Sequence, residues 1–229
     1  MKNERIAILE LAQNRGHHII ETLYRCGVPR SKLDVIHLHE GQAPRQSYVA
    51  VISSGGPGSV RENKSTSDSA CGIAIATAIF RKWLSEEIPI LGICLSHQLL
   101  GQLMGGHVSK SACGTVLGFE EIRVVEPDDI FHGIPEKFIL AQHHHDEVKV
   151  LPHGWCVLAN SESCGIEVMR CVGHPVWTLQ GHPELSFEFV RNGMLKGRIP
   201  TCGLLPRPGS DYEKNRLKLF SNFLDVVAF

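Results

Sequence analysis

The amino-acid sequence predicts an α/β protein built on a doubly wound, mostly parallel sheet. In the first half of the chain, short apolar runs typical of buried strands alternate with segments whose apolar residues recur at helical spacing. This alternation favours parallel strands with helices on the faces of the sheet. Short β-like runs in the second half indicate antiparallel strands added to it. With 229 residues, 43% of them hydrophobic, we expect a single domain over residues 1–229.

The first half supplies the parallel strands and the helices between them. Apolar residues at helical spacing indicate a helix over Asn14–Cys26, and Gly27 ends it. The polar stretch Ser59–Ser69 lacks periodicity and is expected to be a loop. Buried strands are predicted at Arg5–Leu11, Leu33–His39, Tyr48–Ser53 and Ile88–Ile93, and further helices at Ala70–Leu84 and Leu95–Met104.

The second half contains shorter β-like runs that are separated by Gly, Pro and Asn. These runs suggest antiparallel strands that extend the sheet. The last segment, Asp211–Val227, places its apolar side chains on one helical face, with Ser210 or Asp211 as the N-cap. The expected antiparallel strands are Phe119–Val125, Phe138–Ala141, Trp155–Asn160, Gly165–Arg170 and Val176–Gln180.

Composition excludes several classes of function. The net charge of −1 and the pI near 6.9 give no electrostatic reason to expect binding to nucleic acid or to an anionic membrane. No apolar run approaches the ~20 residues that a transmembrane helix needs. The N-terminus lacks the layout of a signal peptide, and the eight cysteines form no C-x-x-C pair. We therefore expect a cytoplasmic protein with reduced thiols.

The segment Ile88–Gly106 organises the rest of the chain. An apolar strand runs to Ile93 and a helical pattern begins at Leu95, so Cys94 falls on the turn between them. Such a turn exposes a side chain and places it beside the first helical N–H groups, which favour a thiolate. A buried core cysteine is the competing interpretation, because strands often end in this residue type.

Two further motifs favour the functional interpretation of Cys94. A glycine-rich run, Gly55–Gly58, follows the third predicted strand, and Gln180–Glu184, which reads QGHPE, follows the last one. Ligands of open parallel sheets bind where the carboxyl ends of the strands gather. The glycine run lacks a following G-K-[ST], so it does not indicate a phosphate loop.

These three motifs, in this order, resemble the class I (triad-type) glutamine amidotransferases, including the glutaminase of GMP synthase and its free-standing relatives. The family elbow reads G-x-C-x-G-x-Q and its base motif reads H-P-E; the segment His143–Val148 also resembles the family's H-x-D-x-V. The likeness spans Ile6–Glu184 and implies the flavodoxin-like glutaminase fold.

The resemblance assigns roles to individual residues. Cys94 would be the nucleophile, His182 the general base and Glu184 the residue that orients the imidazole. The backbone N–H groups of Gly56 and Leu95 would form the oxyanion hole, and the missing Cβ of a glycine suits close approach to substrate. Glutamine-binding residues would be Gln98, Pro57, Gly58, His144 and Asp146. A solvent-facing helical glutamine is the competing interpretation of Gln98.

Two positions depart from the family pattern. The glycine expected two residues after the nucleophile is Ser96, whose hydroxyl could bond locally at the helix start. Where many relatives carry an acidic residue before x-Gly, this chain has Val116-Leu117-Gly118. Because relatives use that loop to hold the α-amino and carboxylate groups of glutamine, a γ-glutamyl peptide or conjugate is an alternative substrate.

The resemblance also implies partners. We expect glutamine hydrolysis that supplies ammonia to a separate synthetase or other acceptor enzyme, without a cofactor. Hydrolysis of γ-glutamyl compounds by the same triad and a non-catalytic regulatory role are the alternatives. No metal is expected: His143, His144 and His145 are consecutive, so their side chains alternate between faces and cannot easily converge on one ion.

Overall fold

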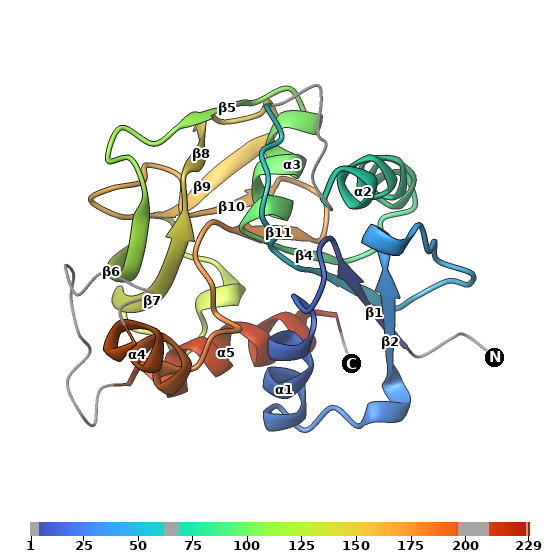
Figure 1. The fold of residues 1–229 in the computed structure, drawn as a ribbon, viewed down its shortest axis with the longest axis horizontal. Coiled ribbons are helices and arrows are strands. Elements are labelled where there is room, and N and C mark those ends of the chain that lie inside the picture. The colour runs from blue at the N-terminus through green and yellow to red at the C-terminus, as the bar shows by residue number, and fades with distance from the viewer. Residues whose placement is uncertain (1–4, 62–68, 197–210, 228) are drawn as a thin grey trace.

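The computed structural model describes residues 5–61, 69–196, 211–227 and 229 (Figure 1). Within these residues a nine-stranded sheet runs in the order β2-β1-β3-β4-β11-β10-β9-β6-β7, and β5 and β8 form a separate pair. The strands are β1 (Ile6–Glu10), β2 (Leu33–His37), β3 (Ala50–Ser53), β4 (Ile90–Ile93), β5 (His107–Lys110), β6 (Val116–Val124), β7 (Lys137–His144), β8 (Asp146–Val150), β9 (Trp155–Asn160), β10 (Val168–Cys171) and β11 (Val176–Leu179).

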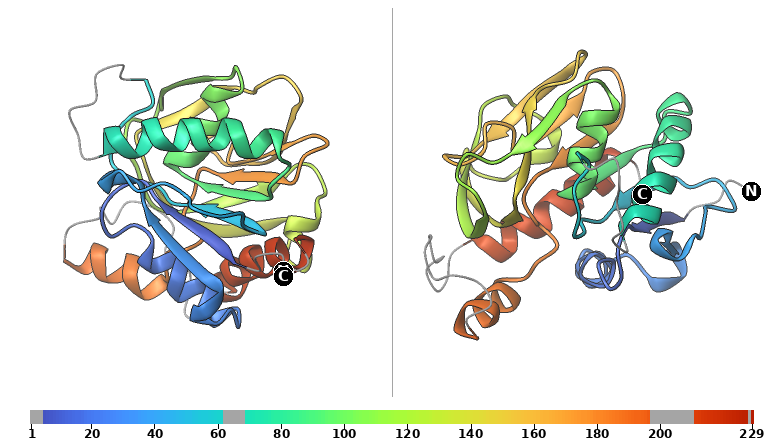
Figure 2. Two further views of the ribbon diagram at one scale, coloured as in Figure 1. Left: turned by 90° about the vertical axis from the view of Figure 1, so that its right-hand side faces the viewer. Right: turned by 45° about the horizontal axis from the view of Figure 1, so that its top comes forward.

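Helices cover both faces of the parallel part of the sheet. Helices α2 and α3 lie on one face, and α1 and α5 lie on the other (Figure 2). The helices are α1 (His17–Arg25), α2 (Ser69–Ser85), α3 (Leu95–Leu103), α4 (Phe187–Leu195) and α5 (Tyr212–Val226), with short 3₁₀ helices η1 (Arg30–Lys32), η2 (Leu38–Glu40) and η3 (Asp129–Phe131).

Strand periodicity explains why each face has its own core. Along β1, Ile6 and Ile8 pack with the buried apolar residues of α1 and α5, whereas Ala7 and Leu9 pack with those of α2 and α3. Successive side chains of a strand point to opposite faces, so a central strand covered on both sides must be apolar throughout. Each buried large aliphatic side chain contributes roughly 1.5–3 kcal/mol through its removal from water.

The predicted fold class is confirmed, with one strand placed differently from the expectation. Strands β2, β1, β3, β4 and β11 pair in parallel, and β10, β9, β6 and β7 continue the sheet antiparallel. The run Val176–Gln180 was expected among the antiparallel strands, but β11 pairs in parallel with β4 and antiparallel with β10. It is therefore the strand at which the sheet changes direction.

Three elements are absent from the sequence-based expectation. Strands β5 and β8 are short and pair only with each other, and α4 follows directly after the QGHPE motif. At the last helix, Asp211 occupies the N-cap position but makes no side-chain capping bond, and Ser210 lies outside the described residues. Residues 62–68 of the expected loop Ser59–Ser69 also lie outside them.

The organisation into a single domain over residues 1–229 remains a prediction. In the part of the chain that the structure describes, no helix is both long and apolar enough to cross a membrane.

Candidate active site

Three segments that follow adjacent parallel strands meet at one edge of the sheet (Figure 1). The glycine run Gly55–Gly58 follows β3, Cys94 follows β4, and Gln180–Glu184 follows β11. Because β3 pairs in parallel with β4 and β4 with β11, the carboxyl ends of all three strands lie together. The fold thus brings the three sequence motifs side by side.

Cys94 occupies a sharp turn between β4 and α3. Its backbone has φ 50° and ψ −101°, a conformation that non-glycine residues rarely adopt. Its N–H donates to the Leu179 carbonyl oxygen at 2.7 Å, and its carbonyl oxygen accepts from the Gln98 N–H at 3.0 Å. One residue therefore ends a strand pairing and starts a helix, as in a nucleophile elbow. Cys94 is buried, as the core interpretation requires, but it also lines a cavity.

His182 and Glu184 form a close pair on an extended segment. Nδ1 of His182 lies 2.7 Å from Oε1 of Glu184. Pro183 between them has a fixed φ and keeps the preceding residue extended, so the two side chains point the same way. Gly181 lets this segment pass close to β7, because a Cβ at Gly181 would lie 2.9 Å from Nε2 of Gln142.

The His182 ring and the Cys94 sulfur converge above Gly55. A Cβ at Gly55 would lie 3.1 Å from Cε1 of His182 and 3.8 Å from Sγ of Cys94. A Cβ at Gly56 would instead meet the side chains of Ala12 and Leu95, each at 3.3 Å. Gly55 is therefore the glycine of this run that leaves room for the sulfur and the imidazole, which the motif alone does not reveal.

The charge state of His182 differs from that of its neighbours. Burial opposes protonation, but the Glu184 carboxylate and the Cys94 sulfur outweigh it and raise the pKa of His182 well above the usual 6.5. Burial and then the charge on His182 lower the pKa values of His143 and His144 to about 4. At neutral pH the site thus contains one imidazolium beside two neutral imidazoles.

A buried arginine from α5 holds the backbone of the Pro183–Glu184 segment. Nη1 of Arg216 donates to the Pro183 carbonyl oxygen at 3.2 Å and to the Thr22 hydroxyl at 3.1 Å. That hydroxyl donates in turn to the Glu184 carbonyl oxygen at 3.2 Å. Glu213 balances the guanidinium through contacts of 2.7 and 3.0 Å. This Arg216 clamp (Arg216, Thr22 and Glu213) combines α1 and α5 and has no sequence motif.

A cavity of about 650 Å³ adjoins Cys94 and His182. Its size is within the range of about 300–1,000 Å³ that is usual for small-molecule sites. Part of the wall comes from α1, α4 and the segments beside them, including Arg15, Phe189 and Lys196, which the motifs do not indicate. All residues assigned to the oxyanion hole or to glutamine binding line it: Gly56, Pro57, Gly58, Leu95, Gln98, His144 and Asp146.

Gln98 and Asp146 make defined contacts in the cavity wall. Gln98 is 4% exposed, which excludes a solvent-facing position. Its Nε2 donates to the Asp146 carbonyl oxygen at 2.7 Å and to Oε1 of Gln180 at 3.2 Å. Oδ2 of Asp146 accepts from the Ser59 hydroxyl at 2.5 Å and from Nε of Arg61 at 3.0 Å. These contacts join α3, β8 and the segment after the glycine run.

The two departures from the family pattern are both buried. The Ser96 hydroxyl donates to the Ser54 carbonyl oxygen at 2.8 Å and lies 2.7 Å from the Ser53 hydroxyl. The expected local bond at the helix start is therefore wrong: the hydroxyl links α3 to the end of β3. Val116 pairs with His144 across β6 and β7, so an apolar side chain stands beside this part of the wall.

The three consecutive histidines contact different partners. Nδ1 of His145 lies 2.8 Å from the Thr115 hydroxyl, and Nδ1 of His144 lies 3.2 Å from the Asp146 carbonyl oxygen. The ring of His143 lies 6.5 Å from that of His182. This divergence follows from the alternating directions of side chains along an extended segment.

Comparisons with known proteins agree with this geometry. The glutamine-hydrolyzing subunit of GMP synthase from Pyrococcus abyssi is 34% identical over 202 residues, which cover 87% of this chain and 100% of that protein. The protein of the same name from Methanococcus maripaludis strain C5 is 39% identical over 198 residues, or 86% of this chain and 97% of that protein.

Solved structures show the same fold. A glutamine amidotransferase from Thermotoga maritima superposes with a TM-score of 0.81 at 20% identity and covers 99% of both chains. A glutamine amidotransferase from Methylobacillus flagellatus superposes with a TM-score of 0.74 at 16% identity, over 99% of this chain and 94% of that one. The family model described as glutamine amidotransferase class-I matches residues 11–198. The chain belongs to the class I glutamine amidotransferase family.

Proposed function

We propose that this protein hydrolyses the side-chain amide of glutamine to glutamate and ammonia through a thioester on Cys94. The observation that carries the proposal is the convergence of the Cys94 sulfur and the His182 ring above Gly55, with Glu184 2.7 Å behind the imidazole. A cysteine, an imidazole and a carboxylate in this order are the parts of a nucleophilic amidohydrolase site.

The first step is attack by sulfur. The raised pKa of His182 supports an ion pair in which the imidazole already holds the thiol proton of Cys94. The thiolate attacks the amide carbon, a C–S bond forms, and the carbonyl electrons move onto oxygen. Glu184 stabilises the imidazolium and fixes the ring so that Nε2 is the nitrogen available to the reaction.

The oxyanion is assigned to the backbone N–H groups of Gly56 and Leu95. Leu95 is the first residue of α3, where N–H groups have no partner within the helix and the helix dipole is positive. Both residues line the cavity beside Cys94. Loss of one such donor typically raises the barrier by about 3–4 kcal/mol.

The tetrahedral intermediate then collapses. The C–N bond breaks as His182 gives its proton to the amide nitrogen, and ammonia leaves. The neutral imidazole next removes a proton from water, which attacks the thioester carbon and forms a second oxyanion. The C–S bond breaks, glutamate is released, and the Cys94–His182 ion pair is restored.

Substrate recognition is assigned to Pro57, Gly58, Gln98, His144 and Asp146. The last two contribute buried polar atoms that lack a partner in the described residues, Nε2 of His144 and Oδ1 of Asp146. The carboxylate of Asp146 suits the α-ammonium group of glutamine. Gln98 would act by holding the Asp146 backbone, since its amide donates there.

The ammonia acceptor is proposed to be a separate synthetase chain. The relatives from P. abyssi and M. maripaludis are named as one subunit of GMP synthase, and they match this chain over nearly their whole length. By extension, this chain would release ammonia to a partner that performs the amination.

Release of glutamate and ammonia from glutamine tests the proposal directly. The purified chain is assayed alone and with its synthetase partner, and Cys94→Ala serves as the matched control. We expect glutamine-dependent release of both products in equal amounts, and none from the variant. Silence with and without the partner would instead favour the non-catalytic alternative.

Hydrolysis of γ-glutamyl compounds is a second candidate, favoured by the shape of the cavity. The cavity extends from Cys94 to Phe189 and Lys196 around α4, which is further than a single glutamine side chain reaches. The apolar Val116 also stands beside His144, where relatives place an acidic residue. Comparison of kcat/KM for glutamine and for γ-glutamyl dipeptides separates the two candidates, because a preference for the dipeptides would reverse their order.

A further inference from the structure

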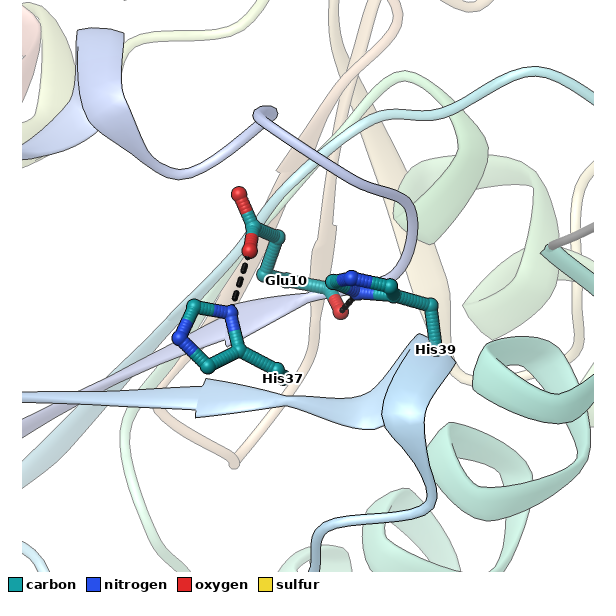
Figure 3. A group of neighbouring side chains, drawn as sticks. All are labelled: Glu10, His37 and His39. Atoms are coloured by element: carbon teal, nitrogen blue, oxygen red, sulfur yellow. Dashed lines mark hydrogen bonds and ion pairs between the residues drawn. The ribbon is translucent and has the colours of Figure 1, made fainter.

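A second group of carboxylate and imidazole side chains lies at the same edge of the sheet, at the ends of β1 and β2 (Figure 3). Glu10 is the last residue of β1, His37 is the last residue of β2, and His39 follows in η2. The parallel register places Glu10 opposite His37, so both side chains leave adjacent strand ends. One donor atom from each of the three side chains lies within 4.8 Å of the other two.

The contacts among these residues are close and directional. Oε2 of Glu10 lies 2.5 Å from Nδ1 of His37. Nδ1 of His39 lies 3.4 Å from the Glu10 carbonyl oxygen, and the two imidazole rings are 5.7 Å apart at 81°. A carbonyl oxygen only accepts, so this contact assigns the N–H of His39 to Nδ1 and the lone pair to Nε2. Histidines that bind metals commonly use their second nitrogen in this way.

Burial sets this group apart from an ordinary surface ion pair. Glu10 is 5% exposed, and a carboxylate removed from water to this degree needs compensation for its charge. Its Oε1 accepts from the Gly16 N–H at 2.8 Å, which leaves Oε2 for the histidines. Glu40 adds a second carboxylate 3.7 Å from Nε2 of His39. The surroundings therefore favour a cation.

We propose that Glu10, His37 and His39 bind a divalent transition metal ion of the Zn²⁺ class. Two imidazoles and one carboxylate, with no thiolate, suit Zn²⁺ and its neighbours in the series better than Mg²⁺ or Ca²⁺. Tetrahedral Zn²⁺ holds its donor atoms roughly 3.3 Å apart, given bond lengths near 2.0–2.2 Å. The present spacing reaches this through small side-chain rotations, with the ion replacing the proton between Glu10 and His37.

The metal accounts for more of the geometry than an ion pair does. A hydrogen bond between Glu10 and His37 explains that pair but not the third donor beside it. The bound ion would tie the end of β1 to β2 and η2 and, through the Glu10–Gly16 contact, to the start of α1. The site shares no residue with the Cys94 site, so it does not rest on the proposed function.

The test is Zn²⁺ and Co²⁺ binding to the purified full chain. Cys94→Ala is used as the background, because the Cys94–His182 pair is itself a potential metal ligand set. His37→Ala and His39→Ala are added to this background, and the exposed His107→Ala is the matched control. Calorimetry gives the stoichiometry, and the visible spectrum of the Co²⁺ form reports its ligands. Circular dichroism without metal checks that each variant folds.

We expect one Zn²⁺ per chain in the background and in His107→Ala. His37→Ala and His39→Ala should weaken binding by more than the ~10–100-fold that loss of an outer partner of a metal ligand costs. The Co²⁺ spectrum should show tetrahedral bands without charge transfer from sulfur. Unchanged binding in the two histidine variants, sulfur bands, or no binding to the folded background would each overturn the proposal.

Discussion

Two Glu–His pairs stand at the same edge of one sheet, and their third members differ. Glu184 contacts His182 at 2.7 Å, and that ring shares the space above Gly55 with the Cys94 sulfur. Glu10 contacts His37 at 2.5 Å, and the third donor is the imidazole of His39. A carboxylate and an imidazole therefore do not determine the chemistry of a site by themselves.

The third group decides what the pair can do. A thiol beside an imidazole can transfer its proton and become a nucleophile. A second imidazole cannot attack an amide carbonyl as effectively, but it can complete a set of metal ligands. The pairs also differ in exposure: the side chain of His182 is 11% exposed and that of His37 is 39% exposed. The first pair faces a cavity and the second faces the rim.

The largest expected difference between the two sites comes from removing the sulfur. Cys94→Ala should lower kcat for glutamine by at least about 10⁴-fold, because no other group forms the acyl intermediate. His37→Ala should leave turnover within about twofold of wild type, since it lies outside the catalytic group. Kinetics at saturating glutamine, with thermal melts of both variants, measure this contrast. Substantial turnover by Cys94→Ala would contradict the mechanism.

The carboxylates provide the next comparison. Glu184→Gln removes the largest influence that raises the pKa of His182, so the alkaline limb of kcat/KM should move to lower pH. We expect kcat to fall on the order of 10²–10⁴-fold, as when an imidazole loses its orienting carboxylate. Glu10→Gln should leave the pH profile in place and abolish Zn²⁺ binding. A pH–rate profile for each variant decides between these outcomes.

The same shift predicts how stability depends on pH. Because the pKa of His182 in the folded state is raised, its contribution to the free energy of unfolding is fully present below pH 6.5, the usual histidine value. It is lost as the pH rises through the folded-state pKa. Denaturant unfolding at acidic, neutral and alkaline pH should show this loss in wild type and a smaller loss in Glu184→Gln. Equal slopes in both proteins would contradict the assignment.

A smaller effect is expected from the Arg216 clamp. Thr22→Val removes the hydroxyl that donates to the Glu184 carbonyl oxygen and accepts from Arg216. We expect kcat to fall about tenfold, a change of about 1.4 kcal/mol, with KM unchanged and with a shifted pH profile. Thr77→Val is the matched control, because its hydroxyl also bonds a carbonyl oxygen, that of Ile73, but lies in α2. Equal kinetics in the two variants would exclude a positioning role for Thr22.

The smallest effect on turnover is expected from Ser96→Gly. The substitution restores the family residue at the elbow but removes two hydrogen bonds that join α3 to β3. Each such bond contributes about 0.5–1.5 kcal/mol, so the free energy of unfolding should decrease while kcat changes little. Denaturant unfolding with parallel kinetics measures both quantities, and a large gain in turnover would show that the serine impairs the site.

The parallel core and the triad could be predicted because each depends on local sequence. Apolar runs mark the buried strands, and Cys94, His182 and Glu184 lie in short motifs at the ends of strands whose parallel arrangement brings them together. Strand β11 was harder, because its direction depends on pairing with β4 and β10 rather than on its own residues.

The rest depends on contacts between distant residues. Thr22 and Arg216 are 194 positions apart and look like ordinary helix residues in the sequence. Glu10 lies on a different strand from His37, so no metal-ligand spacing appears along the chain. The role of Gly55 follows from what a Cβ would touch, which no glycine motif encodes. Tertiary packing sets each of these features.

Labelling with a glutamine-mimicking electrophile tests most directly whether Cys94 is the activated sulfur. Peptide mapping should find one adduct per chain, on Cys94, although Cys71 and Cys113 are exposed and Cys94 is buried. His182→Ala should slow this reaction strongly, and excess glutamine should protect against it. Labelling of Cys71 or Cys113 before Cys94, or labelling of Cys94 at the same rate without His182, would contradict the account.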